Sequence, residues 1–521
     1  MTHQEPPMST EDPRILALRK RRALAIEGGG VDRIERHHAK GRCTARERLG
    51  HLFDPHTFQE LGMLATTRRG DDEERFAGDG VVAGFGLVDG RTVFAYAQDA
   101  TIFGGSLGEM QGRKICQVMD LAVESGAPVV GLIDSGGARI QEGIYGLGGY
   151  AEIFRRNAIY SGIVPQISLL LGPCAGGAAY SPALTDLLVM VEGQSYMFLT
   201  GPEVIRAVTG EIVNAEQLGG ARMHISTSGL AHFVTPSETD AVMLARRLLG
   251  YLPSNHLENA PQTAPAASLP GARAMLNSIV PLDPRQPYSM HSVIEHVVDA
   301  HSFLEVQEQF ARNAIVGLAR LAGQPVGVVA QEPEVLAGAL DIDASDKITR
   351  FVRFCDAFNI PLVTFVDTPG FLPGVDQEYH GIIRHGAKIV YAYSTATVPK
   401  FSIVTRKAYG GAYVVMSSKQ LGTDVTFAWP SAEIAVMGGE GAATILYRKE
   451  IAQAPDPQAA RARYAEEYRD RYLNPYVAAE GGFIDEVIEP AETRERLIIA
   501  LAALRQKAVI PLARRHGNMP A

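Results

Sequence analysis

Residues 97–143 read AQDATIFGGSLGEMQGRKICQVMDLAVESGAPVVGLIDSGGARIQEG, and residues 330–374 read AQEPEVLAGALDIDASDKITRFVRFCDAFNIPLVTFVDTPGFLPG. Shifting one stretch onto the other by 233 residues makes ten positions between Ala97 and Gly137 identical. Unrelated stretches of ordinary composition agree at about 6% of positions, so about two or three matches are expected by chance. We therefore interpret the two halves of the chain as copies of one unit.

A second block of identities follows each stretch, at an offset of 234 residues. It begins with Val-Pro at residues 164–165 and 398–399, and it ends with Gly-Gly-Ala at residues 176–178 and 410–412. The duplication therefore extends over at least one further strand and loop.

Both copies show the order strand, loop, helix, strand. Apolar residues recur at helical spacing from Leu107 to Leu121, and a further helix is expected around residues 180–188. Apolar runs predict strands at residues 92–97, 128–133, 166–171, 325–330, 362–366 and 401–405. Strands joined by helical crossovers are typical of right-handed α/β units.

The chain has 521 residues, of which 46% are apolar and 21% charged, which is typical of a well-packed protein with more than one domain. A Pro- and Ala-rich stretch from Asn255 to Leu276 is interpreted as a crossing between domains rather than a core element. We place one domain at residues 1–260 and the other at residues 261–521.

Charge and cysteine usage exclude several classes of function. The net charge of −9 is spread along the chain, so we expect no nucleic-acid partner, and the basic run at residues 19–22 is interpreted as a solvated helix face. The four cysteines form no CxxC pair, and no His cluster has metal spacing, so no metal is expected. No apolar run reaches 18 residues, so we expect no membrane span and a cytoplasmic location.

Each half has two glycine-bearing loops after apolar strands, where ligands of α/β sheets usually bind. These loops lie at residues 134–139, 174–178, 367–370 and 408–412. Glycine lets a substrate approach the main chain and lets successive N–H groups point at one oxygen. The chain has no GxSxG, HExxH or GKS/T motif, and Asp134 and Asp367 could either cap a turn or belong to a site. A reaction with two stabilised oxyanions and little side-chain acid–base chemistry is therefore favoured.

Several motifs resemble one family. They are DSGGARIQEG at residues 134–143, GPCAGGAAYSP at 172–182, RKAYGGAY at 406–413 and AWPSAEIAVMG at 428–438. They are similar to the carboxyltransferase β subunit of biotin-dependent acyl-CoA carboxylases, in the propionyl-CoA carboxylase branch. The resemblance implies two tandem crotonase-like α/β domains built as a ββα spiral, which agrees with the internal duplication.

The resemblance also implies a reaction, in which carboxybiotin gives its carboxyl group to the α-carbon of a short-chain acyl-CoA. Two oxyanion holes are implied, with Gly176, Gly177 and Ala178 at the thioester oxygen and Gly410, Gly411 and Ala412 at the biotin ureido oxygen. Substrate contacts are expected from Gly136, Gly137, Ala138, Arg139, Lys347 and Val414. Biotin contacts are expected from Tyr409, Gly370 and Phe371.

The chain contains no AMKM-type biotinylation lysine and no ATP-grasp signature. Biotin is therefore expected on a partner α subunit with biotin carboxylase activity, and the resemblance implies a homo-hexamer. Val414 stands where the family usually has an acidic residue, so the preference among propionyl-, acetyl- and longer or branched acyl-CoA stays open. Three alternatives also stay open: the decarboxylase α subunit of a sodium-pump complex, a crotonase-type hydratase or isomerase, and an acyl-CoA-binding scaffold without catalysis.

Overall fold

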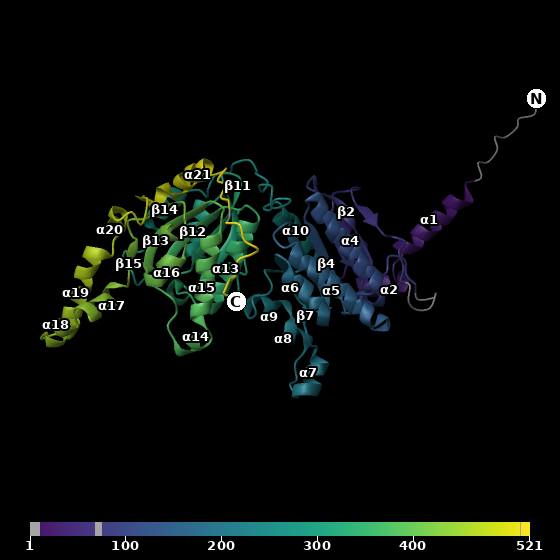
Figure 1. Cartoon of the computed structure of the whole chain (residues 1–521), viewed down its shortest axis with the longest axis horizontal. Helices are drawn as coiled ribbons and strands as arrows, with labels where there is room; N and C mark the ends of the chain where they lie inside the picture. Colours follow the sequence, from purple (N-terminus) through teal and green to yellow (C-terminus); the bar gives the residue numbers. More distant parts are fainter. Residues whose placement is uncertain (1–10, 68–74, 511, 521) are drawn as a thin grey trace, which may run out of the picture. The chain divides into compact units, whose positions relative to one another are not determined.

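The computed structural model describes residues 11–67, 75–510 and 512–520. The chain divides into two compact units. Unit 1 contains the residues up to His224 together with Phe233–Leu248, and unit 2 contains Ile225–His232 and the residues from Leu249 onward. Each unit is built around its own eight-stranded sheet (Figure 1).

The strands of unit 1 are β1 (Gln59–Leu61), β2 (Val81–Val88), β3 (Arg91–Gln98), β4 (Val129–Ser135), β5 (Gln166–Ala175), β6 (Leu187–Val191), β7 (Tyr196–Phe198) and β8 (Phe233–Thr235). Its helices, which lie wholly or mainly in the unit, are α1 (Pro13–Ile26), α2 (Val31–His38), α3 (Ala45–Leu52), α4 (Glu109–Ser125), α5 (Ile144–Ile159), α6 (Tyr180–Leu184), α7 (Pro202–Thr209), α8 (Ala215–Gly219), α9 (Ala221–Ser226) and α10 (Glu238–Leu249).

The strands of unit 2 are β9 (Leu304–Val306), β10 (Ala314–Leu321), β11 (Gln324–Gln331), β12 (Leu362–Thr368), β13 (Lys400–Tyr409), β14 (Val425–Ala428), β15 (Glu433–Ala435) and β16 (Glu486–Val487). Its helices are α11 (Ala272–Ile279), α12 (Met290–Val297), α13 (Ile342–Ala357), α14 (Val375–Tyr379), α15 (Ile382–Thr395), α16 (Gly410–Val415), α17 (Gly439–Leu446), α18 (Arg448–Gln453), α19 (Pro457–Tyr472), α20 (Pro475–Glu480) and α21 (Thr493–Ala503).

The two sheets have the same topology, which confirms the duplication. The strand order β1-β2-β3-β4-β5-β6-β8, with β7 paired to β5, is repeated by β9-β10-β11-β12-β13-β14-β16, with β15 paired to β13. The first three strands of each sheet are antiparallel and the following strands are parallel. Even the irregularities are copied, because the register shifts between Ile133 and Ser135 and again between Val366 and Thr368.

Burial explains why the central strands form. Every residue of β4 and of β12 is buried, as is typical of parallel strands covered on both faces. Helix α4 packs on β2 and β3 and against α5, and α13 packs on β10 and β11 and against α15 (Figure 1). Helix α4 ends at Gly126, whose φ of 63° closes the helix in the left-handed conformation.

Two local predictions were wrong. The helix expected around residues 180–188 stops at Leu184, and Leu187–Val191 is strand β6, because five consecutive apolar residues fit a strand buried on both faces. The crossing expected from Asn255 is irregular only as far as Gly271. Helix α11 then begins, and its Leu276 is buried in the core of unit 2, so its last residues are a core element.

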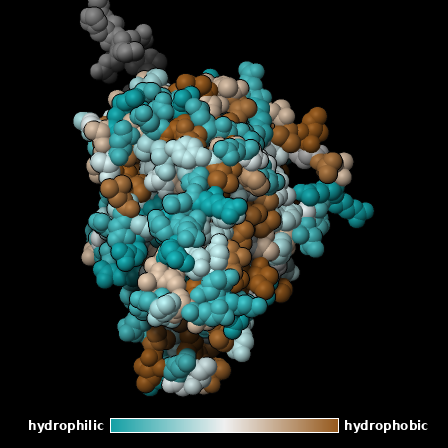
Figure 2. Space-filling view, turned by 90° about the vertical axis from the view of Figure 1, so that its left-hand side faces the viewer, coloured by the Kyte–Doolittle hydropathy of each residue, from teal (hydrophilic) through white to brown (hydrophobic). Residues whose placement is uncertain are grey.

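The basic run Arg19–Arg22 lies on the exposed helix α1, as predicted. No helix within the described residues is long and apolar enough to cross a membrane. The face drawn in Figure 2 is mostly hydrophilic, and its hydrophobic residues gather in several separate groups.

Candidate active site

Three loops of unit 1 meet at the carboxyl ends of its parallel strands; they follow β3, β4 and β5. A Cβ placed on Gly105, in the first loop, would clash with the carbonyl oxygen of Asp134 at the end of β4. A Cβ placed on Gly137, in the second loop, would lie 3.0 Å from the carbonyl oxygen of Ala175 in the third. Glycine is therefore required at these positions for the loops to pack together.

The loop after β4 leaves one main-chain N–H group available. Leu107 donates to the carbonyl oxygen of Gly137 at 2.8 Å, and Arg139 donates to that of Leu107 at 2.9 Å. The N–H group of Gly137 donates to Oγ of Ser135 at 3.2 Å. No acceptor for the N–H group of the intervening residue, Ala138, is found among the described residues, and Ala138 is half-buried.

The loop after β5 leads directly into a one-turn helix, Gly176–Ala179. Gly176 has a φ of 62°, and Gly177, the next residue, is half-buried. The first N–H groups of a helix have no acceptor within the helix, and they carry the positive end of its dipole. The predicted Gly176-Gly177-Ala178 sequence thus lies beside the loop that contains Ala138, because Ser135 pairs with Cys174 across β4 and β5.

Unit 2 repeats this arrangement. Leu340 donates to the carbonyl oxygen of Gly370 at 3.0 Å, and Leu372 donates to that of Leu340 at 2.8 Å. Gly370 itself donates to Oγ1 of Thr368 at 3.3 Å. The N–H group of Phe371 has no acceptor among the residues that the structure describes. Phe371 is thus the counterpart of Ala138.

The Gly-Gly-Ala sequence of unit 2 begins helix α16. Gly410 has a φ of 56°, and a Cβ placed on it would lie 2.9 Å from the carbonyl oxygen of Val436. Gly411 is exposed, Ala412 is buried, and Val414 follows on the same helix with 42% of its surface exposed. The hydroxyl of Tyr409, just before the helix, donates to Glu433 on β15.

Asp134 and Asp367 both form buried ion pairs. In unit 1, Arg48 of α3 donates to Asp134 at 3.0 Å and to Glu238 at 2.7 Å. In unit 2, Arg406 of β13 donates to Asp367 at 3.0 Å. Burial raises the pKa of Asp134, and the guanidinium of Arg48 opposes that rise. These carboxylates hold the strand ends in place, which answers the question left open by the sequence.

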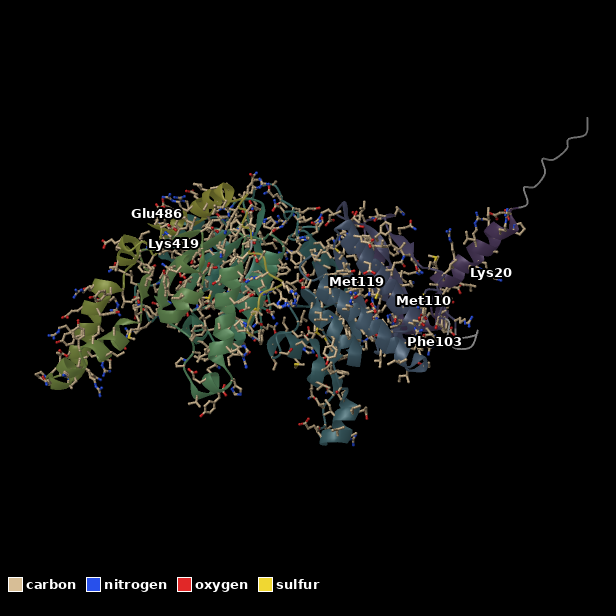
Figure 3. The ribbon with its side chains drawn as sticks, in the orientation of Figure 1. Lys20, Phe103, Met110, Met119, Lys419 and Glu486 are labelled. Carbon is tan, nitrogen blue, oxygen red and sulfur yellow. The ribbon has the colours of Figure 1, made fainter. Side chains whose placement is uncertain are left out.

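Two of the residues expected to contact the substrate have buried side chains. The guanidinium of Arg139 is 2.7 Å from both Asp79 and Glu142, and it lies 4.6 Å from the ring centroid of Phe103. Figure 3 labels Phe103 near the start of α4, whose length is marked by Met110 and Met119. Arg139 therefore braces the loop after β4 from behind.

Lys347 is the second of these residues. Its Nζ donates to the carbonyl oxygens of Gln307, Phe310 and Ala314 at 3.0, 2.8 and 2.7 Å. Burial lowers the pKa of Lys347 to about 8. Its counterpart Lys114 donates to main-chain oxygens in unit 1 in the same way. Both lysines tie their helix to main-chain carbonyl groups of their own unit.

One cluster near the site was missed by sequence reasoning. Arg33, Arg36 and Lys40 lie on or just after α2, and together with the loop 100–104 they line a cavity of about 360 Å³. The spacing of basic residues in RIERHHAK (residues 33–40) was the available signal, but the partner loop lies 60 residues away in the sequence. No group of three His, Cys, Asp or Glu side chains able to hold a metal ion occurs in the described ranges.

Comparisons with known proteins agree on one family. The family model "Carboxyl transferase domain" matches residues 36–519. The propionyl-CoA carboxylase carboxyltransferase subunit of Haloferax mediterranei is 56% identical over 516 residues, covering 98% of this chain and 100% of the relative. The methylmalonyl-CoA decarboxylase subunit alpha of Propionigenium modestum is 52% identical over 516 residues, with the same coverage of both chains.

A solved structure is similar over almost the whole chain. It is a crystal structure of transcarboxylase 12S, described as a hexamer assembly and determined with hydrolysed methylmalonyl-CoA bound. The TM-score is 0.94 and the identity 49%, covering 99% of this chain and 100% of that one.

Proposed function

The chain belongs to the carboxyl transferase family, and from this premise we propose that it moves the carboxyl group of carboxybiotin to the α-carbon of propionyl-CoA, giving methylmalonyl-CoA. It is a biotin-dependent acyl-CoA carboxyltransferase built of two tandem crotonase-like domains. Carboxybiotin, delivered on a partner subunit, supplies the carboxyl group.

The observation that carries the proposal is the pair of matching loop arrangements, one in each unit. Each combines an N–H group without an acceptor, on Ala138 or Phe371, with the start of a helix at a Gly-Gly pair. Carboxyl transfer between a thioester and a ureido group develops negative charge on two oxygens, and main-chain N–H groups are well suited to stabilise it. Two copies of one donor arrangement therefore match a reaction with two oxyanions.

The roles follow from this match. Gly176, Gly177 and Ala178, with Ala138, stabilise the thioester oxygen, while Gly136 and Gly137 let the substrate approach the main chain. Gly410, Gly411 and Ala412, with Phe371, stabilise the ureido oxygen. Gly370 shapes that loop, and Tyr409, held by Glu433, borders it. Arg139 and Lys347 position the loops and helices without contacting substrate.

The buried carboxylates support the same reaction. Asp134 and Asp367 are held in ion pairs with Arg48 and Arg406, so neither is free to take a proton from the α-carbon. In the proposed reaction the departing biotin accepts this proton, and no side-chain base is required. A hydratase or isomerase would need such a base over the thioester.

The partners follow from the chemistry and from the relatives. A biotin-carrying α subunit with biotin carboxylase activity must supply the carboxyl group, since this chain has no lysine in a biotinylation motif. The transcarboxylase 12S neighbour is described as a hexamer, and we assign the same assembly to this chain.

Decarboxylation is the second candidate, because a decarboxylase subunit alpha is 52% identical to this chain. The two activities share their oxyanions and differ in direction. The test mixes the purified chain with a biotinylated α subunit and supplies either ATP, bicarbonate and a panel of acyl-CoA esters or methylmalonyl-CoA alone. ATP-dependent methylmalonyl-CoA formation is the expected result, whereas turnover of methylmalonyl-CoA alone, without carboxylation, would assign the decarboxylase.

A further inference from the structure

A concave cluster of positive charge lies beside the candidate site of unit 1. Its cavity, of about 360 Å³, is lined by Arg33, Arg36, His37, Lys40 and the loop 100–104, and no described carboxylate lines it. Binding sites for small molecules have volumes of roughly 300 to 1,000 Å³, so the cavity is large enough for part of one. A solvated helix face explains exposed cations on a convex surface, but not three cations around a hollow.

The three cations are free to bind an anion. Arg36 donates from Nε to the main-chain oxygen of Asp32 at 3.0 Å, and Arg33 donates to that of Thr101 at 3.2 Å. Among the residues that the structure describes, neither these arginines nor Lys40 forms an ion pair. Like charges held this close repel one another, and an anionic ligand would relieve that repulsion.

The cavity is physically continuous with the site. Gly104, which lines it, accepts a hydrogen bond from the N–H group of Gly136 at 3.2 Å. Phe103, also in the lining, lies under the guanidinium of Arg139. The loop after β3 therefore has the cationic cavity on one side and the loop that contains Ala138 on the other.

Unit 2 has no such cluster at the equivalent place. Shifting by 233 residues places Glu332 and Glu334 opposite Asp99 and Thr101. Glu332 is buried and binds His291, so the counterpart of the cationic rim is acidic. The duplicated units have diverged in charge, as expected if one binds an anionic substrate and the other a neutral ring.

We propose that this cavity binds the phosphate groups of the coenzyme A ester, with Arg33, Arg36 and Lys40 as the contacts. The inference rests on the proposed function, since that function makes an acyl-CoA the substrate. Arginine forms charge-assisted hydrogen bonds with phosphate oxygens, often two at once, and lysine adds a point charge. The three cations raise the affinity for the coenzyme without touching the acyl group.

The test is calorimetric binding of coenzyme A, pantetheine and inorganic phosphate to the full chain. The double variant Arg36→Ala, Lys40→Ala should weaken coenzyme A binding about tenfold or more. It should also reduce the salt dependence of that binding and leave pantetheine binding unchanged. Both side chains are exposed and free of ion pairs, so the variant should fold. Lys20→Ala is the matched control, because Lys20 is an exposed cation on α1 that lies outside the cavity (Figure 3).

Reconstituted carboxylation separates the two proposals. If the wild type carboxylates propionyl-CoA but the double variant binds coenzyme A as tightly as the wild type, the cavity proposal is overturned and the function stands. Equal weakening of coenzyme A and pantetheine overturns it too. If inorganic phosphate binds to the cavity while coenzyme A does not, the cavity is a phosphate site unconnected with the substrate. A wild type that neither binds nor carboxylates acyl-CoA overturns the function itself.

Discussion

Arg48 and Asp134 form an ion pair at 3.0 Å although both side chains are almost completely buried. In unit 2 the same strand-end carboxylate, Asp367, is paired with Arg406 of β13. The position on β5 equivalent to Arg406 is Gly172, where a Cβ would clash with the carboxylate of Asp134. The two copies thus keep the carboxylate and supply its cation from different elements.

Replacing Arg48 by Met should destabilise unit 1 by roughly 3–5 kcal/mol, because it leaves Asp134 and Glu238 buried without a cation. Urea unfolding and the Tm measure the change. Arg113→Met is the matched control, since it breaks an exposed pair with Glu109 and should cost well under about 1 kcal/mol. Equal effects of both variants would contradict the structural role of Arg48.

Alanine substitutions at Gly177 and Gly411 should separate the two oxyanion holes. A Cβ on Gly177 has only Tyr150 near it, at 3.7 Å, and one on Gly411 meets nothing within 4 Å, so both variants should fold. Each methyl group would displace the oxygen held there and should reduce kcat by about 10² to 10³. Gly411→Ala should abolish decarboxylation of free carboxybiotin, whereas Gly177→Ala should mainly impair exchange of the α-proton.

Both glycine variants need a control and an unchanged oligomer. Gly50→Ala serves, because Gly50 is an exposed helix residue with open space around it. If Gly177→Ala and Gly411→Ala lose all partial reactions equally while folded, the assignment of one hole to each unit is wrong.

Val414 is the residue for testing acyl preference. It is 42% exposed on α16, three residues after Gly411, where the family usually has an acidic side chain. Val414→Asp should change the ratio of kcat/KM between propionyl-CoA and other acyl-CoA esters. Val414→Asn, similar in shape but uncharged, shows whether the charge is responsible, and an unchanged ratio in both variants would remove Val414 from specificity.

His291 should make stability dependent on pH. Glu305 and Glu332 each lie 2.7 Å from one of its ring nitrogens and raise its pKa to about 10, from an ordinary value of 6.5. The stabilisation is therefore complete below pH 6.5 and is lost as the pH rises through about 10. The Tm difference between wild type and His291→Gln should shrink over that range, and a constant difference would exclude the charged pair as its cause.

The chain should form a closed homo-oligomer, and a hexamer is expected from the transcarboxylase 12S neighbour. Light scattering of the purified chain measures its mass. A stable monomer that is fully active with the biotinylated partner would contradict this prediction.

The sequence by itself determined the duplication and the loops that matter. Identities at a constant offset, from Ala97 to Ala178, predict two copies of one unit, and the sheets repeat strand for strand. This works because a duplicated pattern of buried and exposed residues specifies the same strand order twice. The same repetition identified the two Gly-Gly-Ala sequences, since glycine is needed wherever loops pack this closely.

Only the tertiary structure decided which charged side chains face inward. Arg139 and Lys347 look like substrate contacts in sequence, but buried carboxylates and main-chain oxygens bind them. Arg36 and Lys40 look like a solvated face, yet they line a cavity with a loop about 60 residues away. The direction of a charged side chain depends on partners from distant segments, and neither periodicity nor spacing contains that information.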